Sequence, residues 1–168
     1  MSFAEVLIFG AVAGLGATII FDIAAVLRQG WGLTHGFYCL VGRWVGSLHH
    51  SGFIHDDIRK TAPVRGEAVL GWGAHVLLGL IYGIGFVFTF GPSALSSPQL
   101  WQGLSFGLVS VLVPWLVFQP LFGWGIGMSK APGTSKLRLK SAINHTVFGF
   151  GIWVSLKLLN LVVAPQWI

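Results

Sequence analysis

The sequence predicts an all-α membrane protein, a bundle of four transmembrane helices with one additional helix at the cytoplasmic surface. Hydrophobic residues make up 54% of the 168 residues and charged residues only 9%, whereas about 25% of residues are charged in typical soluble proteins. Four apolar segments reach the roughly 20 residues that a helix needs to cross a bilayer. Lys and Arg gather in two of the connections between these segments. We therefore expect residues 1–168 to form a single membrane domain.

The four expected spans follow from the distribution of apolar residues along the chain. Residues 68–129 contain no Asp, Glu, Lys or Arg. Pro92 and Pro98 lie in the short connection between the second and third spans, where they cannot interrupt a helix. Trp167 follows the last span and is expected at the membrane interface. The predicted spans cover residues 6–27, 68–90, 100–122 and 142–163.

The basic residues predict the orientation of the chain in the membrane. Outside the spans, five lie between the first and second spans, and four lie between the third and fourth. These residues are Arg28, Arg43, Arg59, Lys60 and Arg65, and then Lys130, Lys136, Arg138 and Lys140. The positive-inside rule places both basic loops in the cytoplasm and both termini on the periplasmic side. The net charge of +5 thus indicates membrane orientation and not nucleic-acid binding.

The first basic loop contains a further helical pattern over residues 36–50. Its apolar residues recur at helical spacing, and Arg43 falls on the opposite, polar side. This pattern predicts an amphipathic helix in the cytoplasmic interface, or a short re-entrant segment. Residues 51–67, which follow, have the composition of a solvated polar loop.

Glycine and histidine spacing suggests two similar hairpins, a 2+2 pseudo-repeat. The first span carries Gly10-x-x-x-Gly14 and the third carries Gly103-x-x-x-Gly107, while the second and fourth carry His-x-x-x-Gly from His75 and His145. Close helix packing alone explains such glycines equally well. The same faces could bind a second copy of the chain or a membrane partner.

Four polar side chains, one from each span, fall in the cytoplasmic third of the membrane. Polar groups are costly in lipid, so we expect them to face inward and to pair with one another. This arrangement favours a site for protons or for a small lipophilic or ionic ligand, although a purely structural polar cluster explains the same residues. The predicted site consists of Asp22, His75, Gln119 and His145, with Arg43, Glu67 and His55 near its mouth.

Two kinds of cofactor, haem and a divalent metal, are compatible with residues of this chain, and the sequence assigns neither. Haem b could be held between His75 and His145. A divalent metal could be bound by His75, His145 and Asp22. A second metal candidate is the loop set His49, His50, His55, Asp56 and Asp57. The adjacent His49 and His50 would diverge on a helix, so a solvated loop explains that cluster as well.

Short motifs along the chain together resemble the DUF2938 family of bacterial integral membrane proteins. They include GATIIFD at 16–22, GRW at 42–44, GWGAH at 71–75 and FQPLFGWG at 118–125. The resemblance extends over nearly the whole chain. It implies a multi-pass protein of the bacterial inner membrane and a family of unknown function. It also implies one recurring set of residues: Asp22, Arg43, Glu67, His75, Gln119 and His145.

Three functions therefore stay open at the level of the sequence. The first is a small binding or transport protein. The second is a membrane redox or lipid-modifying enzyme that uses haem, metal or quinone through His75 and His145. The third is a structural subunit of a membrane complex. No nucleophile elbow, phosphate loop or dinucleotide fingerprint occurs, so the sequence does not decide whether the protein is an enzyme.

Overall fold

The computed structural model describes residues 2–163. The protein is 82% helical, and the described residues contain no strand. Four helical stretches are long and apolar enough to cross a membrane, which confirms the predicted fold class: Phe3–Gln29, Glu67–Phe90, Leu100–Leu121 and Thr134–Val162. Trp167 lies outside the described residues.

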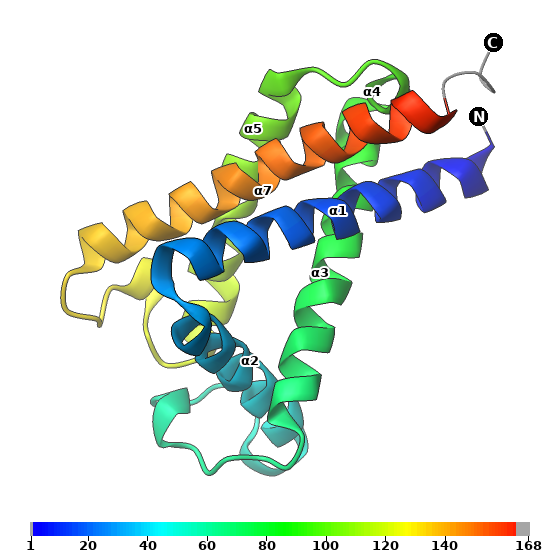
Figure 1. Cartoon of the computed structure of the whole chain (residues 1–168). Coiled ribbons are helices and arrows are strands. Elements are labelled where there is room, and N and C mark those ends of the chain that lie inside the picture. Colours follow the sequence, from blue (N-terminus) through cyan, green and yellow to red (C-terminus); the bar gives the residue numbers. More distant parts are fainter. Residues whose placement is uncertain (1, 164–168) are drawn as a thin grey trace. The chain divides into compact units, whose positions relative to one another are not determined.

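The elements follow one another as helices joined by short connections (Figure 1). The long helices are α1 (Phe3–Gln29), α2 (Trp31–Ser51), α3 (Glu67–Phe90), α5 (Leu100–Ser110) and α7 (Thr134–Val163). The short elements are η1 (Ile58–Lys60), α4 (Ser93–Ser96), η2 (Pro114–Phe118), α6 (Gln119–Leu121) and η3 (Ile126–Met128).

The last span begins earlier than the sequence predicted. Helix α7 starts at Thr134, whereas the apolar pattern starts only at residue 142. Residues 135–141 are rich in Lys, Arg and Leu, which are good helix formers. Hydropathy detects the part of a helix that suits a bilayer and misses the polar turns that extend it.

The additional helix is also longer than residues 36–50. Gly30 separates α2 from α1 with a φ of 83°, a conformation that suits glycine because it has no Cβ. Helix α2 then runs from Trp31 to Ser51. Its position at the membrane surface stays a prediction.

The third span changes its helical type in its last third. After α5, residues Pro114–Phe118 form the π-helical segment η2, in which the Gln119 N–H donates to the carbonyl of Pro114, five residues earlier. Pro120 has no N–H and cannot complete the ordinary α-helical pattern at this turn. A π-helical turn accommodates that loss, and such turns are frequent at functional sites.

The chain folds into two compact units. Unit 1 contains residues 2–24, 76–109 and 143–163 of the described chain, and unit 2 contains residues 25–75 and 110–142. Each unit is therefore built from segments that are far apart in the sequence. The single domain expected for residues 1–168 stays a prediction.

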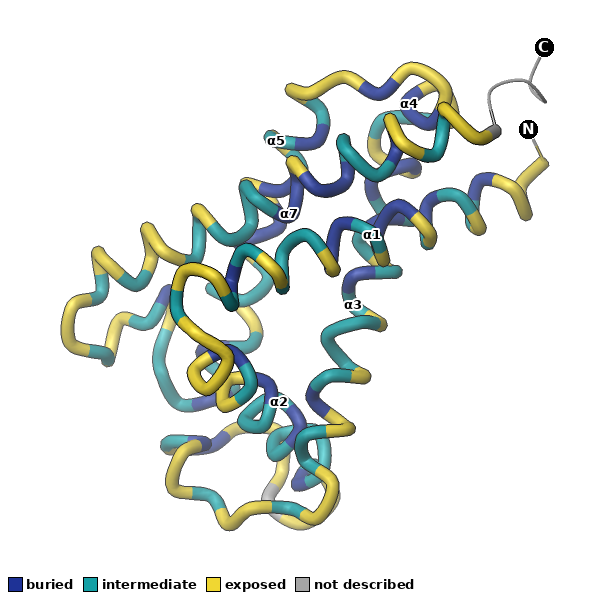
Figure 2. The backbone as a smooth tube through the Cα atoms, in the orientation of Figure 1, coloured by how far each residue is buried: buried dark blue, intermediate teal, exposed yellow. Residues whose placement is uncertain are grey.

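Unit 1 has an apolar core made by its parts of α1, α3, α4 and α7. Buried and exposed residues alternate along α1 (Figure 2), as expected for a helix with one packed side. The Asn160 side chain of α7 donates from Nδ2 to the Leu95 carbonyl of α4 at 2.6 Å. The core residues are Val6, Ala13, Ala17, Phe86, Val87, Ala94, Leu95, Phe148, Ile152 and Leu156.

Glycines bring two helix pairs of unit 1 into backbone contact. Between α1 and α3, a Cβ on Gly14 would collide with the backbone of Gly79. Between α5 and α7, a Cβ on Gly149 would collide with the backbone of Gly103. Packing inside the chain thus accounts for these glycines. The similar contacts support the two-hairpin hypothesis, and common ancestry of the hairpins stays a hypothesis.

Candidate functional site

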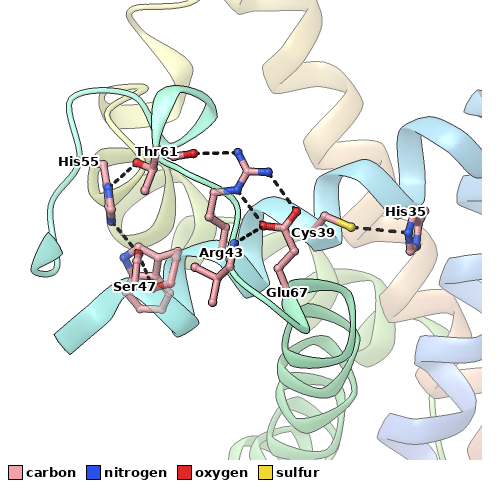
Figure 3. Close-up of polar contacts among 9 residues, drawn as sticks. His35, Cys39, Arg43, Ser47, His55, Thr61 and Glu67 are labelled. Atoms are coloured by element: carbon pink, nitrogen blue, oxygen red, sulfur yellow. Dashed lines mark hydrogen bonds and ion pairs between the residues drawn. The ribbon is translucent and has the colours of Figure 1, made fainter. Parts of the chain in front are cut away.

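Arg43 and Glu67 form the central ion pair of unit 2 (Figure 3). Arg43 donates from Nε to Glu67 Oε2 at 2.9 Å and from Nη2 to Oε1 at 3.0 Å. Its Nη1 donates to the Thr61 carbonyl at 3.1 Å. The hydrogen bonds to Glu67 raise the pKa of Arg43 above its ordinary value. Arg43, which the sequence placed on the polar side of its helix, thus finds its counter-ion on α3.

Two glycines let α2 and α3 approach closely enough for this pair to form. A Cβ on Gly42 would collide with the Glu67 carbonyl, and a Cβ on Gly71 would collide with the Tyr38 carbonyl. Gly42 directly precedes Arg43 in the GRW motif. In this motif Gly42 provides the close contact with α3, and Arg43 provides the cation that pairs with Glu67.

His55 joins the same network through Thr61. Its Nδ1 lies 2.9 Å from Thr61 Oγ1, and its Nε2 lies 3.4 Å from Ser47 Oγ. The ring is buried. The three residues expected near the site mouth, Arg43, Glu67 and His55, are thus brought together. Thr61 connects them, and no spacing pattern in the sequence indicated that role.

The loop after α2, which the sequence predicted to be solvated, is docked at His55 and Ile58, while most of its other residues are exposed. The His55 N–H donates to the Leu121 carbonyl at 2.9 Å, and the Ile58 N–H donates to the Phe122 carbonyl at 3.0 Å. Ile58 is fully buried. A Cβ on Gly123 would collide with the backbone of the loop. The FGWG motif at 122–125 therefore packs against a loop that lies more than sixty residues earlier in the sequence.

Asp57 adds a side-chain contact between the loop and the FGWG motif. Its carboxylate accepts hydrogen bonds from Arg59 Nη2 at 2.7 Å and from Trp124 Nε1 at 3.3 Å. The Arg59 guanidinium holds the pKa of Asp57 well below its usual range. The Arg59 side chain is 66% exposed and lies over the Trp124 ring at 6.0 Å.

An aromatic–imidazole cluster, which the sequence analysis missed, joins α2 to the start of α3. Trp31 stacks on Trp72 with ring centroids 5.6 Å apart, and Tyr38 stacks on His75 at 4.3 Å. Tyr38 Oη also lies 3.0 Å from His75 Nε2. Trp72 Nε1 donates to His35 Nδ1 at 3.1 Å. The signal available in the sequence was the helical spacing of residues 31, 35 and 38, and of 72 and 75.

Trp115 and Gln119 each bury a polar atom that has no hydrogen-bond partner within the described chain. These atoms are Trp115 Nε1 and Gln119 Oε1. Gln119 is 6% exposed and follows directly after the π-helical turn that contains Trp115. Of the four residues predicted to share a site, Gln119 is the one whose geometry indicates a missing partner.

The other three residues of that predicted site have different surroundings. His75 belongs to unit 2 with Gln119, whereas Asp22 and His145 belong to unit 1. The His145 carbonyl packs against Gly107 of α5. A shared site formed by all four residues stays a prediction.

No group of three or more His, Cys, Asp or Glu side chains within residues 2–163 is placed to hold a metal ion. In the loop set, His55 and Asp57 already bond to protein groups. For haem, ligation through His75 Nε2 would require that atom to leave Tyr38.

The four apolar helices, each long enough to cross a membrane, are those of a multi-pass membrane protein. Residues 11–159 match the family described as "Protein of unknown function (DUF2938)", and the chain belongs to that family. No curated protein and no solved structure matches the chain.

Proposed function

We propose that this protein is a small membrane binding protein, with a site for a lipophilic molecule that carries a polar end. The site lies in unit 2 at Trp115 and Gln119, in the part of the third span expected near the cytoplasm. Transport would use the same binding step. The main support for this proposal is that two buried polar atoms, Trp115 Nε1 and Gln119 Oε1, have no hydrogen-bond partner in the part of the protein that the structure describes.

Energetics support an external partner for these atoms. A buried polar group without a hydrogen bond costs about 1–3 kcal/mol, and native proteins satisfy the large majority of such groups. Trp115 Nε1 can only donate and Gln119 Oε1 can only accept. A ligand that serves both must offer one acceptor and one donor, as a hydroxyl, a carboxylic acid or a primary amide does.

The local fold also suits a ligand of this kind. Trp115 and Gln119 are four residues apart, so both project from the same side of the helical turn. Aromatic rings lie next to this segment in unit 2: Trp44 contacts Phe118 and Phe122, with ring centroids 5.8 Å and 6.0 Å apart. An apolar wall with few polar groups is typical of small-molecule sites.

The test uses the full chain purified gently from membranes and examined by native mass spectrometry. We expect a co-purified small molecule on the native protein, and its loss in Trp115→Phe and Gln119→Leu. The control is Trp101→Phe, which removes the indole N–H of an exposed tryptophan and should keep the molecule.

Thermal melting separates this proposal from a packing role. Extended exchange into fresh detergent should remove the ligand and lower the melting temperature of the native protein, while Gln119→Leu should not respond. The proposal is wrong if no molecule co-purifies and Gln119→Leu melts at or above the native temperature. In that case the leucine only removes an unsatisfied buried amide.

A further inference from the structure

Charge is divided unequally between the two units. Unit 2 contains nine of the ten Lys and Arg residues and three of the five acids, so its formal charge is +6. Unit 1 contains Lys157 and two acids. Both basic loops therefore fold into one compact unit, although the second and third spans separate them in the sequence.

The loop of residues 52–66 combines exposed cations with exposed apolar side chains. Lys60 and Arg65 are exposed, whereas the nearby Arg59 is already paired with Asp57. Phe53 is 65% exposed and Ile54 is 75% exposed. Large apolar side chains grouped with cations are typical of surfaces that lie on membranes.

The fold holds these apolar side chains outward. The Trp44 indole donates to the Phe53 carbonyl at 2.9 Å, and the next residue in the loop after Ile54, His55, is buried. Ile58 is buried as well. The loop thus has its own inward-facing residues, and Phe53 and Ile54 are not among them.

Connectivity brings this loop to the bilayer surface. Arg65 stands two residues before Glu67, where the apolar helix α3 begins. A cation at that position lies within reach of lipid headgroups. Lys and Arg close to an anionic membrane surface contribute about 1 kcal/mol each to the attraction.

We propose that residues 52–66 dock on the surface of the surrounding bilayer and bind its anionic phospholipids. Phe53 and Ile54 enter the boundary between headgroups and acyl chains, and Lys60 and Arg65 bind the lipid phosphates. The carboxylate of Asp56, which is exposed in the same loop, is repelled by anionic lipids. The two cations must outweigh this repulsion, and the two apolar side chains add to the binding.

The test measures the depth of the loop in reconstituted vesicles. Ile54→Cys in a Cys39→Ser background carries a fluorescent label, and nitroxide lipids report its depth. The vesicles contain phosphatidylcholine alone, or an equal mixture with phosphatidylglycerol. We expect stronger quenching in the anionic vesicles and a decrease of that difference at high salt.

Charge variants, each checked for native helix content by circular dichroism, assign the effect to this loop. The apparent affinity for phosphatidylglycerol in mixed micelles should fall about fivefold for each of Lys60→Gln and Arg65→Gln. Phe53→Ser/Ile54→Ser should also weaken it. Lys157→Gln in unit 1 should leave it unchanged, and Lys130→Gln/Lys136→Gln in the other basic loop, which lacks the apolar anchors, should weaken it less than Lys60→Gln/Arg65→Gln does.

Three results would overturn the proposal. One is a label that is quenched equally in neutral and anionic vesicles, since charge would then have no role. Another is a label that no nitroxide lipid quenches. The last is an equal loss of affinity in Lys130→Gln/Lys136→Gln, which would assign binding to the charge of the whole unit.

Discussion

Arg43 on α2 and Glu67 at the start of α3 are joined by two hydrogen bonds, of 2.9 Å and 3.0 Å. The same carboxylate accepts the Val64 N–H at 3.2 Å, and the same guanidinium donates to the Thr61 carbonyl. Both side chains are largely shielded, with exposures of 13% and 18%. The pair therefore holds the second half of the loop between α2 and α3, at Thr61 and Val64, against both helices.

Arg43→Lys should destabilise the protein although it keeps the charge. Lysine cannot reproduce the two-point geometry or reach Thr61 at the same time. We expect a loss of about 1–3 kcal/mol in the free energy of unfolding, measured as a lower melting temperature in detergent. Arg59→Lys at the exposed pair with Asp57 is the matched control and should cost less than about 1 kcal/mol. Equal losses would contradict the central role of Arg43.

Acid should weaken the contact between the loop and the FGWG motif through Asp57. Its pKa in the folded protein is lowered by Arg59, so the ionised carboxylate stabilises the fold above its unfolded pKa of about 3.9. That contribution is lost as the pH falls below this value. The melting temperatures of the native protein and Asp57→Asn should therefore differ most near neutral pH and converge in acid. A difference that grows in acid would contradict this assignment.

Two glycines of α3 should respond to alanine in opposite directions. A Cβ on Gly83 would collide with the backbone of Gly10, whereas a Cβ on Gly73 meets nothing within 4 Å. Gly83→Ala should lower the melting temperature because backbone atoms cannot move aside. Gly73→Ala should raise it slightly, because alanine is favoured over glycine within a helix by about 1 kcal/mol. Similar effects at both positions would refute close packing of α1 on α3.

The tautomer of His35 should be fixed by Trp72. An indole N–H can only donate, so His35 Nδ1 must accept and the ring proton must reside on Nε2, which lies 3.5 Å from Cys39 Sγ. Nitrogen NMR of the labelled protein should show this single tautomer, and Trp72→Phe should yield a mixture. The exposed His49 provides the control, with no change expected. A protonated Nδ1 in the native protein would contradict the hydrogen bond.

Gln119 illustrates how far local sequence reasoning extends at the candidate site. Its place in an apolar span predicted a polar residue that needs a partner. The π-helical turn and the second unsatisfied atom of the site, on Trp115, are evident only in the folded structure. The residue type identified the candidate, and the folded backbone supplied the evidence for a ligand.

The spans were readable from the sequence because a membrane helix satisfies its own backbone hydrogen bonds, so length and hydropathy alone identify it. The glycine spacing likewise predicted close helix contacts. Only the tertiary structure decided that Thr61 bonds to both Arg43 and His55, and that Trp124 donates a hydrogen bond to Asp57. These contacts link segments without a shared periodicity, and Asp57 and Trp124 are 67 residues apart. Which donor meets which acceptor at such separation depends on the path of the whole chain, because many polar side chains in the loops could make the same bond.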